Sequence, residues 1–109
     1  GPTIRNKLGV ALSSRNEYLS NEELQEASKI YQSLKDIKQM GIAGEVGIKH
    51  LKQSLSQKLN QIKYSKVEYI SIAKQSTLEE MTEILQKPAI LSLAVWIGKT
   101  RLIDNIIIK

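Results

Sequence analysis

The sequence predicts an α+β fold, a small three-stranded antiparallel sheet packed with two long helices and a short helix. Two observations support this prediction. The first half of the chain holds two stretches with the apolar spacing of amphipathic helices, and the second half holds three apolar runs rich in β-branched residues. The chain has 109 residues, of which 41% are hydrophobic and 25% are charged. These values are typical of a globular domain, so we expect residues 1–109 to form a single domain.

The first helix is predicted over residues 21–40. Ser20 is a favourable N-cap, and Glu23 stands three residues later, which is the spacing of a capping box. Gly41 suits the C-terminal cap, because glycine adopts a left-handed conformation without strain. The apolar residues recur at helical spacing and would form one face: Leu24, Ala27, Ile30, Tyr31, Leu34 and Ile37.

The second helix is predicted over residues 45–62, after a short link at 42–44. Its apolar face consists of Ile48, Leu51, Leu55, Leu59 and Ile62. Because both helices are amphipathic and closely connected, we expect them to pack against a common core.

The three predicted strands are residues 67–73, 89–97 and 101–108. The last two flank a Gly-Lys-Thr sequence at 98–100, which favours a tight hairpin with glycine in the turn. Between the first two strands, Ser76 and the acidic residues after it predict a short capped helix that ends before Pro88.

Two polar features of the last strands have competing interpretations. The Gly-Lys-Thr sequence is similar to the end of a phosphate-binding P-loop, but that motif needs an earlier glycine at position 93, which is Leu93. The hairpin is therefore the better interpretation. Asp104 and Asn105 interrupt an apolar strand, and an outward-facing or bulged position is about as plausible as a packing or hydrogen-bonding role.

The composition excludes several classes of site. The chain has no cysteine, which excludes disulfides, thiolate zinc sites and a cysteine nucleophile, and which fits a reducing cytoplasm. His50 is the single histidine, and we expect it to be a surface residue; no metal site is predicted. No apolar run approaches the ~20 residues of a membrane-spanning helix, so we expect no membrane partner.

The net charge of +5 leaves a second class of function open. A small basic module could bind nucleic acid through the lysines of its two helices. Those lysines lie among acidic residues and are not interleaved with aromatic residues, so a solvated surface is the favoured interpretation and no nucleic-acid partner is expected.

The most informative stretch is residues 9–20, which read Gly-Val-Ala-Leu-Ser-Ser-Arg-Asn-Glu-Tyr-Leu-Ser. Ser13, Ser14 and Arg15 place two hydroxyls and a guanidinium shortly before a helix. Such residues can hold phosphate, and the N-terminus of the helix would also favour an anion. From the residues alone, a turn that merely caps the helix is about equally plausible.

Three blocks of the sequence are characteristic. Residues 2–5 read Pro-Thr-Ile-Arg and precede the stretch 9–20, residues 67–69 read Val-Glu-Tyr, and residues 98–105 read Gly-Lys-Thr-Arg-Leu-Ile-Asp-Asn. In these blocks the sequence resembles the pantoate–β-alanine ligases, the pantothenate synthetase family. The resemblance spans essentially the whole chain, but it is a resemblance to the C-terminal domain of that family alone.

This resemblance implies an ATP-dependent acid–amine ligase of the coenzyme A pathway. Pantoate and ATP form pantoyl adenylate and pyrophosphate, and β-alanine then displaces AMP to give pantothenate. The chain would be a lid that works with a larger N-terminal Rossmann-type domain carrying a His-x-Gly-His signature, and the fragment alone would be inactive. The resemblance further implies a cytoplasmic homodimer and Mg²⁺ held with ATP by residues outside this fragment.

The resemblance also assigns the candidate site residues. Ser13, Ser14 and Arg15 would bind the ATP phosphates, and Arg15 would be the catalytic residue. Leu12 would lie against the nucleotide, and the main chain near Ile4 would meet the adenine. The family commonly has Met and Val at these last two positions, which are conservative differences.

Overall fold

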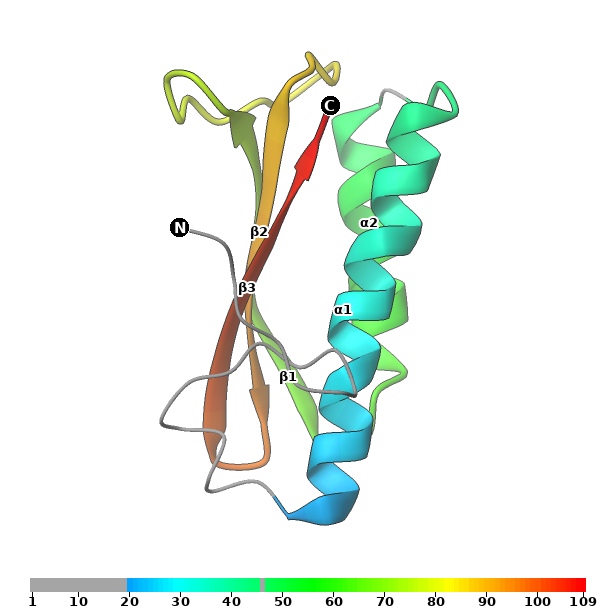
Figure 1. Cartoon of the computed structure of the whole chain (residues 1–109), viewed down its shortest axis with the longest axis vertical. Helices are drawn as coiled ribbons and strands as arrows, with labels where there is room; N and C mark the ends of the chain where they lie inside the picture. Colours follow the sequence, from blue (N-terminus) through cyan, green and yellow to red (C-terminus); the bar gives the residue numbers. More distant parts are fainter. Residues whose placement is uncertain (1–19, 46) are drawn as a thin grey trace.

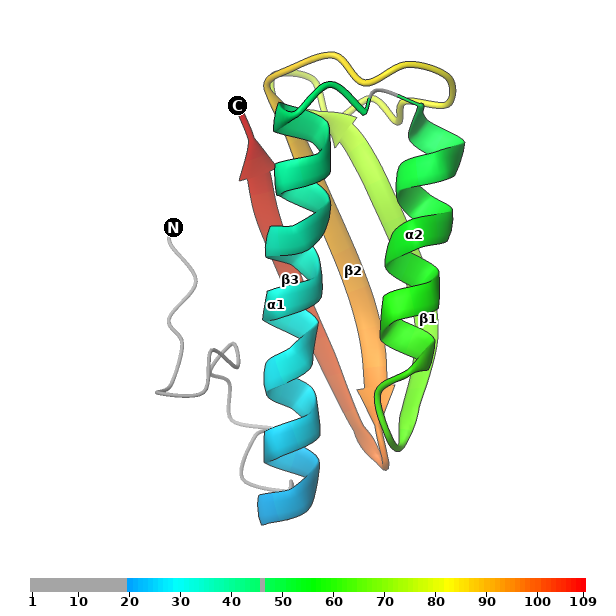
Figure 2. The same ribbon diagram turned by 90° about the vertical axis from the view of Figure 1, so that its right-hand side faces the viewer.

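The computed structural model describes residues 20–45 and 47–109. These residues form two layers, a pair of helices and a sheet (Figure 1). The elements are α1 (Asn21–Ile42), α2 (Ile48–Asn60), β1 (Ser65–Lys74), β2 (Ala89–Ile97) and β3 (Thr100–Ile108). The three strands form one antiparallel sheet in the order β1-β2-β3, and both helices cover the same face of it (Figure 2). The predicted α+β arrangement is therefore confirmed.

Helix α1 begins at the predicted cap. The Ser20 hydroxyl accepts a hydrogen bond from the Glu23 amide at 3.1 Å, and the Glu23 carboxylate accepts one from the Ser20 amide at 3.1 Å. The C-terminal prediction is wrong, because the helix continues to Ile42 and Gly41 lies inside its last turn. Gly41 packs closely there: a Cβ at this position would lie 3.1 Å from Cδ2 of Leu85, which would have to shift slightly.

Helix α2 is shorter than predicted, at both ends. Gly47 is its N-cap, and the amide of Ile48 donates to the carbonyl of Glu83 at 3.0 Å, outside the helix. The link between the helices therefore extends to Gly47 and is longer than expected. Ile48 is also the first residue of the apolar face, so the helix begins where its buried side begins.

The core lies between the helices and the sheet. Alternate residues of the central strand β2 point into it, and the helices supply leucine and isoleucine side chains from the opposite side. The largest fully buried side chains include Leu34, Ile37, Leu51, Leu55, Leu91 and Leu93. The core is therefore aliphatic, as expected of a chain without phenylalanine.

Neither described helix, α1 or α2, covers the opposite face of the sheet. Tyr69 pairs with Ala94, and Ala94 pairs with Ile103, so these three side chains form one row across the outer face. The register between β1 and β2 shifts at Glu68, which is the extra residue of a β-bulge. The bulge thus places the Glu68 side chain where it contacts residues of both β2 and β3.

The predicted short helix between β1 and β2 does not form. Residues 75–88 are a loop, in which Leu78 has a φ of 62°, a left-handed value that a helix cannot contain. Thr77 instead accepts a hydrogen bond from the Glu79 amide at 3.2 Å. Met81 and Leu85 of this loop are buried in the core, so the loop is held by its apolar side chains.

The β2–β3 connection is the predicted hairpin. Gly98 has a φ of +60°, and Gly98 and Lys99 form the turn between Ile97 and Thr100. Asp104 pairs with the core residue Leu93 and is only 4% exposed. The alternative of a packing or hydrogen-bonding role is therefore confirmed for Asp104, whose carboxylate accepts from the Asn105 amide at 2.8 Å.

Candidate functional site

The predicted ATP-binding residues Ile4, Leu12, Ser13, Ser14 and Arg15 lie outside the described residues. Their roles stay predictions. The structure does describe the end of the domain to which this stretch connects, because Ser20 is the N-cap of α1. The described part of the site therefore begins at Ser20.

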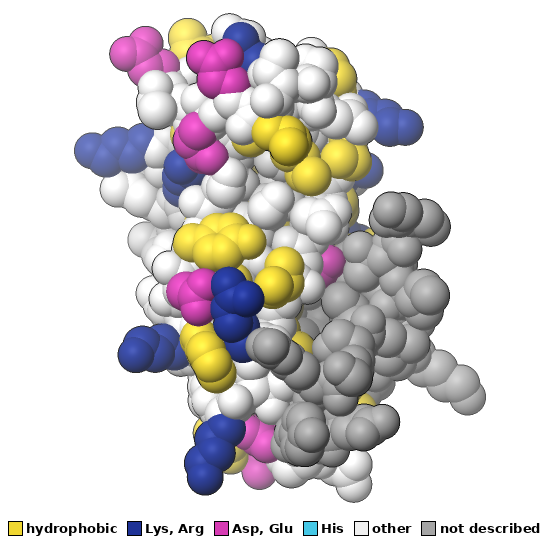
Figure 3. All heavy atoms as spheres, turned by 90° about the vertical axis from the view of Figure 1, so that its left-hand side faces the viewer, with side chains coloured by type: hydrophobic (Ala, Val, Ile, Leu, Met, Phe, Trp, Pro, Cys, Tyr) yellow, Lys and Arg dark blue, Asp and Glu magenta, His cyan; other side chains and the backbone are white. Residues whose placement is uncertain are grey.

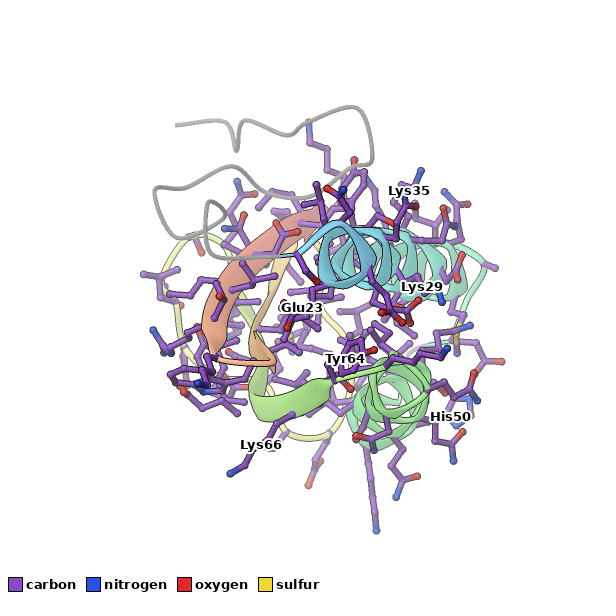
Figure 4. All side chains as sticks on the ribbon, turned by 90° about the horizontal axis from the view of Figure 1, so that it is seen from below. Glu23, Lys29, Lys35, His50, Tyr64 and Lys66 are labelled. Atoms are coloured by element: carbon purple, nitrogen blue, oxygen red, sulfur yellow. The ribbon has the colours of Figure 1, made fainter. Side chains whose placement is uncertain are left out.

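The start of α1 is held against the turn between β2 and β3. A Cβ at Gly98 would overlap Oε2 of Glu23, so the carboxylate of Glu23 lies directly against the glycine backbone. The amide of Gly98 donates to the carbonyl of Tyr64 at 2.9 Å. Figure 4 looks at this end of the molecule and shows Glu23 and Tyr64 close together. We call Ser20, Glu23, Tyr64 and Gly98 the α1 anchor.

Two further contacts fix α1 to the segment between α2 and β1. A hydrogen bond with Glu22 raises the pKa of the Tyr64 hydroxyl, with burial adding to the shift. One turn further along, Glu26 accepts from the Lys63 amide at 3.0 Å and from Nζ of Lys29 at 2.9 Å. These two hydrogen bonds lower the pKa of the Glu26 carboxylate, and the one from the Lys63 amide has the larger effect. The first two turns of α1 are thus tied to elements distant in sequence.

The capping box bears on one expectation about anion binding. The Ser20 and Glu23 amides at the helix N-terminus already donate within the chain, and Glu22 and Glu23 add negative charge there. The first turn of α1 therefore offers a phosphate fewer amide donors and a less favourable charge than an uncapped helix N-terminus would. The expectation that this helix end favours an anion stays a prediction, as do the roles of Ser13, Ser14 and Arg15 as phosphate donors.

Two carboxylates organise networks that the sequence pattern did not predict. Glu68 accepts from Nε1 of Trp96 at 3.0 Å and from Arg101. Glu80 accepts from Nζ of Lys52 and from the Ile72 amide, both at 2.9 Å, and from the Ser71 hydroxyl. Glu68 belongs to the Val-Glu-Tyr block, but the sequence alone gives no sign that it pairs with the block at 98–105.

The described residues contain no candidate metal centre. Within residues 20–45 and 47–109, no three His, Asp or Glu side chains lie close enough to hold a metal ion. His50 is exposed, as predicted, with Nε2 3.8 Å from the Glu45 carboxylate. In the same part of the chain, neither helix has the length and apolar character needed to cross a membrane.

The charge distribution does not favour the nucleic-acid alternative. Figure 3 shows the outer face of the sheet, where basic and acidic side chains are interspersed. Several basic side chains of the described residues are engaged by carboxylates: Lys29 with Glu26, Lys52 with Glu80, Lys58 with Asp36, Lys74 with Glu79, and Arg101 with Glu68. Cations held in ion pairs contribute less counterion release to a nucleic acid than unpaired ones do.

Comparison with known proteins identifies the family. Residues 1–107 match the pantoate-beta-alanine ligase family. A pantothenate synthetase of Herpetosiphon aurantiacus is 42% identical over 106 residues, which are 97% of this chain and 38% of that protein. A pantothenate synthetase of Thermotoga petrophila is 39% identical over 107 residues, 98% of this chain and 38% of that protein.

Solved structures agree with the sequence comparison. Pantothenate synthetase from Thermus thermophilus superimposes with a TM-score of 0.85 at 28% identity, over 97% of this chain and 38% of that one. Pantoate-beta-alanine ligase from Francisella tularensis, complexed with beta-gamma ATP and beta-alanine, gives a TM-score of 0.57 at 28% identity, over 98% of this chain and 31% of that one.

The fold and the sequence blocks are therefore those of one part of a ligase. The chain belongs to the pantoate-beta-alanine ligase family, the pantothenate synthetases. It spans 38% of the length of the relatives from Herpetosiphon aurantiacus and Thermotoga petrophila. The resemblance in the three sequence blocks is thus confirmed at the level of the family.

Proposed function

We propose that this chain is the C-terminal lid domain of a pantothenate synthetase. The observation that carries the proposal is the match of almost the whole chain to 38% of relatives that are pantothenate synthetases. The remaining part of the enzyme would be an N-terminal Rossmann-type domain that holds pantoate and most of the nucleotide. The complete enzyme would be a cytoplasmic homodimer of the coenzyme A pathway.

The reaction has two steps. In the first, a carboxylate oxygen of pantoate attacks the α-phosphorus of ATP, the bond to the β-phosphate oxygen breaks, and pyrophosphate leaves. In the second, the amine of β-alanine attacks the acyl carbon of pantoyl adenylate and loses a proton, and AMP leaves. The products are pantothenate, AMP and pyrophosphate.

The roles of this chain follow from the charge that develops in the first step. Negative charge moves toward the leaving pyrophosphate, and Arg15 can donate two parallel hydrogen bonds to its oxygens. Ser13 and Ser14 add hydroxyl and main-chain donors beside Arg15. Leu12 would lie against the nucleotide, and the main chain near Ile4 would meet the adenine. The use of ATP is supported by the relative from Francisella tularensis, which is complexed with beta-gamma ATP.

Mg²⁺ would bind with ATP, where it would neutralise phosphate charge. Within residues 20–45 and 47–109, no group of three His, Asp or Glu side chains is placed to hold the ion. The ligands of the ion would then come from ATP and from the rest of the enzyme.

A reconstitution experiment tests the proposal. The full-length enzyme should convert pantoate, β-alanine and ATP to pantothenate, with one AMP and one pyrophosphate for each product. Residues 1–109 alone should form no pantothenate under the same conditions. Ligation by the isolated chain would contradict the lid assignment, and tight DNA or RNA binding that falls steeply with salt would favour the basic-module alternative.

A further inference from the structure

The α1 anchor contains a contact that only glycine permits. A Cβ at position 98 would overlap Oε2 of Glu23 and would lie 3.3 Å from its Cδ, so the whole carboxylate would have to move. The other oxygen of that carboxylate, Oε1, accepts from the Ser20 amide at 3.1 Å. Moving the carboxylate away from Gly98 therefore disturbs the bond that holds Ser20.

Ser20 connects the anchor to the proposed phosphate-binding residues. It stands five positions after Arg15 in the sequence, and it is the residue at which α1 begins. The turn at Gly98 is itself fixed, because its amide donates to the Tyr64 carbonyl and its strands are paired with each other. The hairpin is thus a rigid support for Glu23, and Glu23 is a support for Ser20.

We propose that Gly98 is a positioning residue for adenylate formation, which acts by leaving room for the Glu23 carboxylate and so keeping the cap at Ser20 closed. This inference rests on the function proposed above. Gly98 touches no substrate. Its effect on the reaction passes through Glu23 and Ser20 to Arg15.

A double-mutant cycle separates this mechanism from simple backbone strain. The Gly98→Ala change strains a backbone with φ +60° and also displaces Glu23, whereas Glu23→Ala removes the carboxylate alone. If Gly98 acts through Glu23, each single change slows single-turnover adenylate formation by about 10-fold, and the double variant is also slowed by about 10-fold. Independent effects would multiply to about 100-fold in the double variant.

Gly44 supplies the matched control. It also has a positive φ, of +109°, but a Cβ there would meet nothing within 4 Å. Gly44→Ala therefore introduces strain at the other end of α1 without moving a carboxylate. It is expected to lower the melting temperature of the full-length enzyme while leaving the adenylation rate within about 2-fold of wild type, the scatter expected of a distant site.

The measurements are made on the full-length enzyme. Stopped-flow adenylation at saturating ATP should show a lower rate constant in Gly98→Ala, with KM for pantoate unchanged, because pantoate would bind the other domain. Hydrogen exchange of the Ser20 amide should be faster in Gly98→Ala and in Glu23→Ala, and unchanged in Gly44→Ala.

The outcomes distinguish the two proposals. Unchanged exchange at Ser20 in Gly98→Ala would overturn the coupling through Glu23, whatever the activity. Faster exchange with an unchanged adenylation rate, or multiplicative effects in the double variant, would overturn the positioning role and leave the proposed function intact. If the Ser20 amide of the wild-type enzyme exchanges as expected but the enzyme forms no adenylate, both the proposed function and this role of Gly98 would be overturned.

Discussion

Arg101 and Glu68 form a bidentate ion pair across the outer face of the sheet. Nε of Arg101 donates to Oε1 of Glu68 at 3.0 Å, and Nη2 donates to Oε2 at 2.6 Å. Glu68 comes from the bulge in β1 and Arg101 from β3, so the pair spans the central strand. Trp96 of that central strand donates to the same carboxylate. One side chain of the bulge therefore links all three strands.

This network predicts a pH dependence for Trp96 fluorescence. The hydrogen bond from Arg101 first, and that from Trp96 second, lower the pKa of the Glu68 carboxylate below the ordinary value of a glutamate. The stabilisation is present above that usual value and is lost as the pH falls through the lowered pKa. Trp96 is the only tryptophan of the chain, so its emission should titrate with a midpoint below the ordinary pKa of a glutamate.

The Arg101→Gln variant is the control for this titration. It removes the positive charge and one of the two parallel donors, so the midpoint should rise toward the usual glutamate value. An identical midpoint in both proteins would show that Arg101 does not set the protonation of Glu68.

Glu80 predicts a second stability effect, at the opposite end of the sheet. Burial raises the pKa of Glu80, but hydrogen bonds from Ser71, Lys52 and the Ile72 amide outweigh it and lower the pKa. Glu80→Ala should leave the Ile72 amide without its acceptor, lower the free energy of unfolding by about 1 kcal/mol and speed hydrogen exchange at Ile72. The loss should shrink as the wild-type carboxylate is protonated at low pH.

Glu79 is the matched neighbour for this measurement. It is exposed, and its carboxylate lies 3.9 Å from Nζ of Lys74. Glu79→Ala should change the free energy of unfolding by less than about 0.5 kcal/mol. Equal losses at positions 79 and 80 would mean that the Glu80 network does not hold the loop to β1.

Truncating a single buried leucine of the core should lower the free energy of unfolding by more than either glutamate change. Leu55 is fully buried on α2, and Leu55→Ala should lower the free energy of unfolding by about 2–5 kcal/mol through lost burial and a cavity. Leu78 is 69% exposed, and Leu78→Ala should stay within about 0.5 kcal/mol of wild type. Urea unfolding monitored by circular dichroism measures both. Similar midpoints for the two variants would contradict the placement of the core.

Much of the fold could be predicted because its signals are local. The capping box at Ser20, the glycine turn at Gly98 and the spacing of apolar residues depend on a few neighbouring positions. The element ends were predicted less well. Gly41 looked like a helix cap, but its lack of a side chain serves packing against Leu85, a contact between distant segments. The short helix was predicted wrongly for the same reason. The Glu80 carboxylate accepts a hydrogen bond from the Ile72 amide of β1, a contact outside the loop that holds Glu80.

The candidate site was predicted mainly from the family blocks. Ser13, Ser14 and Arg15 lie outside the described residues, so their roles rest on that resemblance and on the chemistry of phosphate binding. The anchor formed by Glu23 and Gly98 could not be predicted, because a contact between a helix start and a hairpin 75 positions later leaves no local pattern. The anion-binding role expected at the start of α1 stays a prediction, and the capping box there uses the amides of Ser20 and Glu23.

The central claim is that this chain delivers Arg15 to the ATP phosphates of a pantothenate synthetase. Single-turnover formation of pantoyl adenylate by the full-length enzyme tests it most directly. Arg15→Ala should slow this step by about 10²–10³-fold, because a well-aimed donor to the developing charge is lost. Arg15→Lys should recover part of the rate, and Lys66→Ala, which changes an exposed lysine on β1, should match wild type. An unchanged rate of adenylate formation in Arg15→Ala would contradict the account.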